Sequence, residues 1–188
     1  SAEYNRHRLD LLAPEENRND YRDCFQWIEG MSVYLNCKRI YPQLMGIQTN
    51  LYKNFIVRTW GLLSKDGIVG LLHPNGPYDD ANGGKLRKEI YPRLRAHYQF
   101  RNELKNTLFK DIGNREEFSI NIYGSKQNLI NFHVISNLFH PNSIRGCHLH
   151  NRPYEFVPGM KNDKDEWEFR PHCHRIITIT ENELDILT

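Results

Sequence analysis

The residues with the clearest potential for chemistry are cysteines and histidines near the C-terminal end of the sequence. Cys147 and His150 form one group, and His172 and Cys173 form a second. Zinc in proteins is typically held by four such ligands, so two groups of this kind could close one site. His172 and Cys173 are adjacent, without the spacer of about two residues that usually separates paired zinc ligands. We therefore expect scattered surface histidines and no metal, with zinc bound by these four residues as the alternative.

The same region allows one further interpretation. Three of its histidines stand close in sequence to asparagines, a combination that would suit a histidine-metal nuclease. The residues concerned are His140, His148 and His150, with Asn142 or Asn151. The lack of regular ligand spacing argues against this interpretation as it does against zinc.

A second candidate region is a loop rich in glycine, aspartate and proline, which spans residues 76–84. Three basic residues follow it, Lys85, Arg87 and Lys88. If the loop approaches DNA, these side chains would contact backbone phosphates, and such contacts position a protein without specifying a base sequence. The start of a solvated helix would explain the same charges equally well.

These residues must be positioned by helices and strands that the sequence pattern predicts. Apolar residues recur at helical spacing after Asn50, which is a suitable N-cap, so we predict a helix over residues 51–63. A second helical stripe, with Tyr21, Phe25 and Ile28, follows the break at Pro14. The basic residues would lie on a helix over residues 85–94 that is interrupted near Pro92.

The predicted strands indicate an α/β fold. Residues 68–72 form a continuous apolar run, which is typical of a strand buried on both faces in a parallel sheet. Residues 97–100 suggest another short strand, and residues 118–123 and 131–138 alternate as an antiparallel edge pair would. A last strand is expected over residues 176–179, followed by a helix with a capping box between Thr180 and Glu183.

Several of these segments, in this order, resemble parts of adenine-N6 DNA methyltransferases. The resemblance is closest to large type IIG-like restriction-modification and phage-defence methylases and covers roughly residues 31–180. It rests on QTNLYKNF at 48–55, LLSKDGIVGLLHP at 62–74, YDD at 78–80, GGKLR at 83–87, YPRL at 91–94, NELK at 102–105, FSINIYG at 118–124 and W-x-x-RPH-x-x-RII at 167–177.

This resemblance implies a fold, a reaction and site residues. The fold would be the C-terminal part of a Rossmann-like class I methyltransferase sheet with an antiparallel edge pair, over residues 1–140. Residues 141–188 would be a less regular extension that begins the following target-recognition or linker region. The parent enzyme would transfer a methyl group from S-adenosylmethionine to the adenine exocyclic amine of double-stranded DNA. Asn50 and Tyr52 would flank the cofactor, and Phe118 would contact the flipped base.

Two motifs of the resembling family are missing from the sequence. The family binds S-adenosylmethionine at a glycine-containing turn and holds the target amine with an Asn/Asp-Pro-Pro-aromatic loop, and the sequence has no Pro-Pro pair. We therefore expect the catalytic residues upstream of Ser1, a fragment that is inactive alone, and self-association through the truncated sheet surface. The alternative is a non-catalytic, zinc-stabilised nucleic-acid-binding module.

Composition excludes other classes of protein. The 188 residues are 39% hydrophobic and 26% charged, and no apolar run approaches the ~18 residues that cross a membrane. Aromatic residues make up 12%, which excludes a wholly disordered chain. A net charge of +2 permits a nucleic-acid partner without requiring one. Four widely spaced cysteines and no signal-peptide pattern predict a reducing, cytoplasmic setting.

Overall fold

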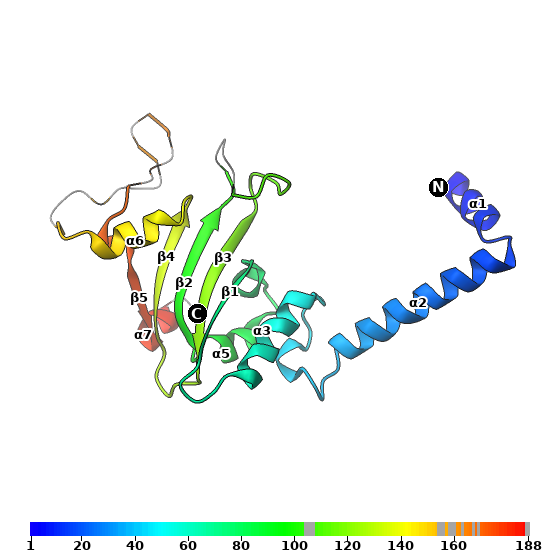
Figure 1. Ribbon diagram of the computed structural model, residues 1–188, viewed down its shortest axis with the longest axis horizontal. Coiled ribbons are helices and arrows are strands. Elements are labelled where there is room, and N and C mark those ends of the chain that lie inside the picture. Colours follow the sequence, from blue (N-terminus) through cyan, green and yellow to red (C-terminus); the bar gives the residue numbers. More distant parts are fainter. Residues whose placement is uncertain are drawn as a thin grey trace.

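The computed structural model describes residues 1–103, 108–153, 157, 161–162, 164–166, 168 and 170–186. Residues 104–105 and Trp167, which belong to two of the resembling segments, lie outside this part of the chain. Within the described residues, no helix is long and apolar enough to cross a membrane. Figure 1 shows a twisted sheet with helices against it and a helical arm that projects away from it.

The arm consists of helices α1 (Ala2–Leu11) and α2 (Glu15–Leu35), which meet at Pro14. The predicted helix after Pro14 is confirmed. Neither helix contains a buried residue, and Phe25 and Trp27 are more than half exposed. The arm is joined to the body at its C-terminal end, where the Asn54 side-chain amide donates a hydrogen bond to the Leu35 carbonyl at 2.9 Å.

The body is built on a mixed sheet in the order β1-β3-β2-β4-β5. Its strands are β1 (Ile68–Pro74), β2 (Leu94–Arg101), β3 (Glu117–Gly124), β4 (Asn131–Leu138) and β5 (Ile177–Thr180). Strand β3 is antiparallel to both β1 and β2, so β1 and β2 run parallel to each other. Strand β4 pairs with β2 in parallel and with β5 antiparallel. The α/β class is therefore confirmed.

Two predictions about the strands are wrong. Strands β3 and β4 are not paired, because β2 lies between them. The alternation in both strands indicates only which residues share a face, and β3 carries buried Ser119 and Asn121 on one of its faces. Strand β1 is not buried on both faces: within the described residues it lies at the edge of the sheet, with Ile68 69% and Leu72 55% exposed.

One face of the sheet is covered by α3 (Leu51–Leu62), α5 (Gly84–Ile90) and the short 3-10 helix η1 (Pro42–Leu44). Ile56, Leu86, Ile90 and Tyr123 belong to the core beneath them. Helix α3 agrees with the prediction, and the Asn50 side chain caps it by accepting the Tyr52 N–H at 3.4 Å. The predicted helix over residues 85–94 is too long, because α5 ends before Pro92 and Leu94 already begins β2.

The opposite face carries a second core, centred on Phe100, Phe118, Ile135 and Leu138. Helix α6 (Asn142–Leu149) packs there through Cys147, as Figure 1 shows over β4. The remaining elements are α4 (Gly76–Asp79), the short 3-10 helix η2 (Cys173–Arg175) and α7 (Glu181–Ile186). The capping box is confirmed, since Thr180 N donates to Glu183 Oε2 at 2.8 Å. Strand β5 belongs to the predicted second region, residues 141–188, and it pairs with β4 of the first region.

Candidate functional site

Polar side chains from three strands and one helix meet under α3, at the carboxyl end of β1. The Asn121 amide lies at their centre: its nitrogen donates to His73 Nε2 at 2.9 Å, and its oxygen accepts from the Tyr78 hydroxyl at 2.6 Å and from His97 Nδ1 at 2.7 Å. The Tyr123 hydroxyl lies 3.2 Å from both Tyr78 and His73. We refer to these five residues as the polar network.

Burial favours the uncharged form of the four ionisable residues of the polar network. It lowers the pKa of His73 to about 4 and also lowers the pKa of His97. It raises the pKa values of the Tyr78 and Tyr123 hydroxyls. Because the His73 Nδ1 atom lies 2.8 Å from the Pro74 carbonyl, it carries the ring proton, and Nε2 accepts. The network therefore fixes the end of β1 in place and supplies no ionised acid or base.

The two predicted cofactor-binding residues lie next to the polar network. The Tyr52 ring stacks on His73 with centroids 5.8 Å apart and planes inclined by 15°. A Cβ atom at Gly76 would lie 2.7 Å from the Tyr52 hydroxyl, so this glycine allows the loop after β1 to approach the ring. Asn50 uses its side chain to cap α3. Of the pair, Tyr52 packs at the carboxyl end of β1, and the Asn50 side chain is engaged at the start of α3.

The predicted DNA-backbone residues have different environments. Lys85 and Lys88 are exposed on α5. The Arg87 guanidinium instead donates to the carbonyls of Pro77 at 3.3 Å and Asp80 at 2.6 Å. Arg87 therefore holds the loop after β1 in shape, and the two lysines present their charge to solvent.

Lys53 and Asp80 tie the same loop to α3. The Lys53 ammonium is nearly buried and donates to Asp80 Oδ2 at 3.2 Å and to the Gln48 carbonyl at 3.3 Å. Hydrogen bonds from the Asn82 N–H and from Lys53 lower the pKa of Asp80. The ion pair thus anchors the end of α4 against the first turns of α3.

We expect Asp80→Asn to lower the free energy of unfolding by about 1–3 kcal/mol, because it leaves the Lys53 ammonium nearly buried without a counter-charge. Urea unfolding at pH 7 measures this loss. Asp79→Asn is the matched control, since its side chain accepts from Asn75 at 2.9 Å and an amide oxygen can replace that acceptor. Equal losses in the two variants would contradict the assigned role of the ion pair.

The predicted base-contact residue, Phe118, lies on the other face of the sheet. Its ring stacks on Phe100 with centroids 5.3 Å apart and meets Phe109 edge-on at 5.0 Å. Only 8% of Phe118 is exposed. The structure therefore does not bring Phe118 together with Tyr52, and it places the ring within the second core.

The structure brings together three of the four residues of the zinc alternative. Ligand atoms of His150, His172 and Cys173 all lie within 4.8 Å of one another. Cys147 is not among them, because α6 turns its side chain into the second core. His140 and His148, which the nuclease interpretation would use as ligands, are exposed and are not part of this group.

The polar network was missed by reasoning from sequence. Its signal was present, since Ser119 and Asn121 occupy the same face of β3 as the buried Tyr123. Two polar residues on the core face of a strand require hydrogen-bond partners, which marks them for attention. Identifying His73 and His97 as those partners required the strand order, which was predicted wrongly.

Comparison with known proteins gives no family assignment. No protein-family model matches the chain, and no curated protein matches it significantly. Function must accordingly be argued from the arrangement of the residues described above.

Proposed function

We propose that this chain forms the C-terminal part of an adenine-N6 DNA methyltransferase domain that acts in restriction-modification or phage defence. In this proposal the complete domain transfers a methyl group from S-adenosylmethionine to the exocyclic amine of adenine in double-stranded DNA. Tyr52 would contribute to the cofactor site, while the glycine-containing turn and the Asn/Asp-Pro-Pro-aromatic loop would be supplied by residues outside these 188, so the chain alone would be inactive. The reaction in this proposal follows from the family resemblance described above, and the observation that supports an incomplete domain is the exposed outer edge of β1.

That edge is suited to receive more of the same sheet. In the described part of the chain, no strand pairs with the outer side of β1, and its Ile68 and Leu72 side chains are largely exposed. Helix α3 next to it exposes three further apolar side chains, Leu51, Phe55 and Leu62. An open strand edge flanked by apolar surface favours pairing with another strand. We infer that the rest of the domain covers it, and that the chain alone self-associates there.

The direction of the strands supports a ligand site at the carboxyl end of β1. Strands β1 and β2 are parallel and are connected through α4 and α5, with β3 inserted between them. Open α/β sheets bind ligands beyond the carboxyl ends of their parallel strands. Tyr52, His73 and the loop after β1 lie there. The hydrogen bonds of the polar network hold this end of β1 in position. Methyl transfer needs such rigid positioning, because it depends on the alignment of two bound groups.

The proposed DNA-binding surface is the exposed face of α5. Lys85 and Lys88 would contact backbone phosphates while the flipped adenine enters the complete site. Removing either lysine should make DNA affinity less dependent on salt concentration, because fewer counterions are released on binding. Arg87 is assigned to the loop and not to DNA, because its donors are directed to main-chain carbonyls.

The test is binding of S-adenosylmethionine, measured by calorimetry on two proteins. We expect no measurable binding by the 188-residue chain and clear binding by the natural chain extended upstream. In the extended chain, Tyr52→Ala should weaken binding by about 2- to 10-fold, as expected when one aromatic ring is removed from a binding site. Tyr21→Ala, on the exposed arm, is the matched control and should bind as the parent does.

Two results would overturn the proposal. Tight binding of S-adenosylmethionine by the 188 residues alone would contradict their assignment as an incomplete domain. An extended chain that neither binds S-adenosylmethionine nor methylates adenine in DNA would contradict the assigned reaction.

A further inference from the structure

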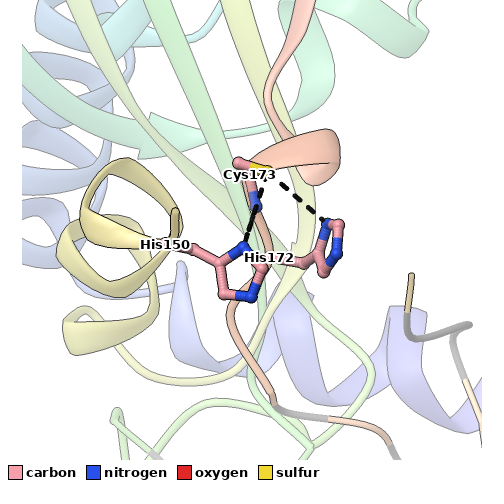
Figure 2. A group of neighbouring side chains, drawn as sticks. All are labelled: His150, His172 and Cys173. Carbon is pink, nitrogen blue, oxygen red and sulfur yellow. Dashed lines mark hydrogen bonds between the residues drawn. The ribbon is translucent and has the colours of Figure 1, made fainter. Parts of the chain in front are cut away.

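His150, His172 and Cys173 come from two segments that meet on the outside of the second core. His150 is the C-cap of α6, His172 is the N-cap of η2, and Cys173 is the first residue of η2. Figure 2 shows both imidazole rings turned toward the Cys173 sulfur. His150 Nδ1 lies 3.5 Å from this sulfur, and His172 Nδ1 lies 4.0 Å from it. We propose that these three residues bind one zinc ion.

The two sulfur–nitrogen distances are close to those of a tetrahedral zinc site. Zinc binds thiolate sulfur at about 2.3 Å and imidazole nitrogen at about 2.0–2.1 Å, so two such ligands of a tetrahedron are about 3.6 Å apart. The separation of His150 Nδ1 from Cys173 Sγ is 3.5 Å, and His172 Nδ1 needs to move only slightly to match it. Two imidazoles and a thiol form a donor set that selects zinc over magnesium or calcium.

The hydrogen bonds indicate that the Nδ1 atom of each ring is unprotonated, because it accepts from a backbone N–H. The Cys173 N–H is directed at His150 Nδ1 at 3.4 Å, and the His174 N–H donates to His172 Nδ1 at 3.0 Å. Since both Nδ1 atoms accept, each ring is in the form whose Nδ1 can ligate a metal. Zinc would replace the two backbone N–H groups at these lone pairs, so both hydrogen bonds would be broken, and the thiol proton of Cys173 would pass to solvent on binding.

The fold holds the two segments together without the ion. A Cβ atom at Gly146 would lie 2.6 Å from Pro171 Cβ, so glycine is needed for the segment before His172 to pack directly on α6. On the other side of the group, the Arg175 guanidinium donates to the carbonyls of Ser136 at 3.2 Å and Asn137 at 3.0 Å, at the end of β4. The ligands are therefore brought together by packing between the two segments.

A zinc ion at this position would link His150 to His172 and Cys173, the residues on either side of the segment 151–171. Three protein ligands leave one tetrahedral position, which a water molecule would fill. Because binding requires the folded arrangement, the ion would add directly to the stability of this region. This inference is independent of the proposed methyltransferase function, since the group lies on the face of the sheet opposite to Tyr52 and His73.

The test is the zinc content of the 188-residue protein, measured by atomic emission after equilibration with zinc and removal of the excess. We expect about one zinc per chain, lost together with thermal stability when a chelator is added. His150→Ala and Cys173→Ser should each abolish stoichiometric binding. His148→Ala and Cys24→Ser, which change exposed residues of the same types, should retain it. A wild-type protein that retains no zinc would overturn the proposal.

Two further measurements guard against variants that simply fail to fold. Cobalt(II) added to the metal-free wild-type protein should produce a sulfur-to-cobalt charge-transfer band, and its absence would contradict thiolate ligation. Gly146→Ala leaves all three ligands in place but pushes Pro171 away, and it should weaken zinc binding by about 10-fold, as is typical when a group that supports metal ligands is changed. Gly30→Ala, where a Cβ meets nothing within 4 Å, is its control. Equal affinities in the two glycine variants would contradict the proposed positioning of the ligands by the packing of Pro171 on α6.

Discussion

Replacing Asn121 with alanine is expected to lower the free energy of unfolding by about 2–4 kcal/mol. The Asn121 side chain is fully buried and makes hydrogen bonds to residues on three other elements. Without it, the His97 N–H loses its acceptor, and His73 Nε2 loses the donor at 2.9 Å. A buried donor left unsatisfied costs its full desolvation free energy, so several such losses at one position exceed the effect of an ordinary hydrogen bond.

Urea unfolding at pH 7, followed by circular dichroism, measures this loss. Asn128→Ala is the matched control, because Asn128 is exposed in the turn between β3 and β4, and its change should stay within about 0.5 kcal/mol. A double variant with His97→Ala should lose less than the two single variants together, since both remove the same hydrogen bond. Strictly additive losses, or a loss below about 1 kcal/mol for Asn121→Ala, would contradict the central position assigned to this amide.

The local signals in the sequence were sufficient for the helices. Asn50 followed by apolar residues at helical spacing predicted α3 with its cap, and Pro14 and Pro92 marked helix boundaries that the structure confirms or moves by a few residues. These features depend on neighbours within one or two turns. The same is true of the capping box between Thr180 and Glu183.

The strand order could not be obtained in this way. Alternation shows which residues of β3 face the core, but it is equally compatible with pairing to β4 or to β1 and β2. The partners of Asn121 are 24 and 48 residues away in sequence, so the polar network depended on that order. The grouping of His150 with Cys173 could be suggested as an alternative because it follows from residue chemistry alone. The structure does not bring Cys147 to them, since it lies one turn before His150 on α6 and its side chain belongs to the second core.

Lowering the pH from 6.5 to 4 is expected to destabilise the protein by about 3 kcal/mol through His73 alone. Burial lowers the pKa of His73 from 6.5 to about 4 in the folded state. Between these values the unfolded chain takes up a proton that the folded chain does not, so the free energy of unfolding falls as the pH falls. The pKa of His97 is lowered by the same cause, and its contribution has the same sign.

The measurement is the free energy of unfolding in urea at several pH values between about 5 and 6.5, a range above the titration of ordinary carboxylates. Removing one difference in proton binding should reduce the slope by up to about 1.4 kcal/mol per pH unit, so His73→Gln should be flatter than the wild type whatever its stability at pH 7. His140→Gln, at an exposed position after β4, should keep the wild-type slope. If His73→Gln retains the full slope, the buried neutral imidazole of His73 is not the group that links the free energy of unfolding to pH.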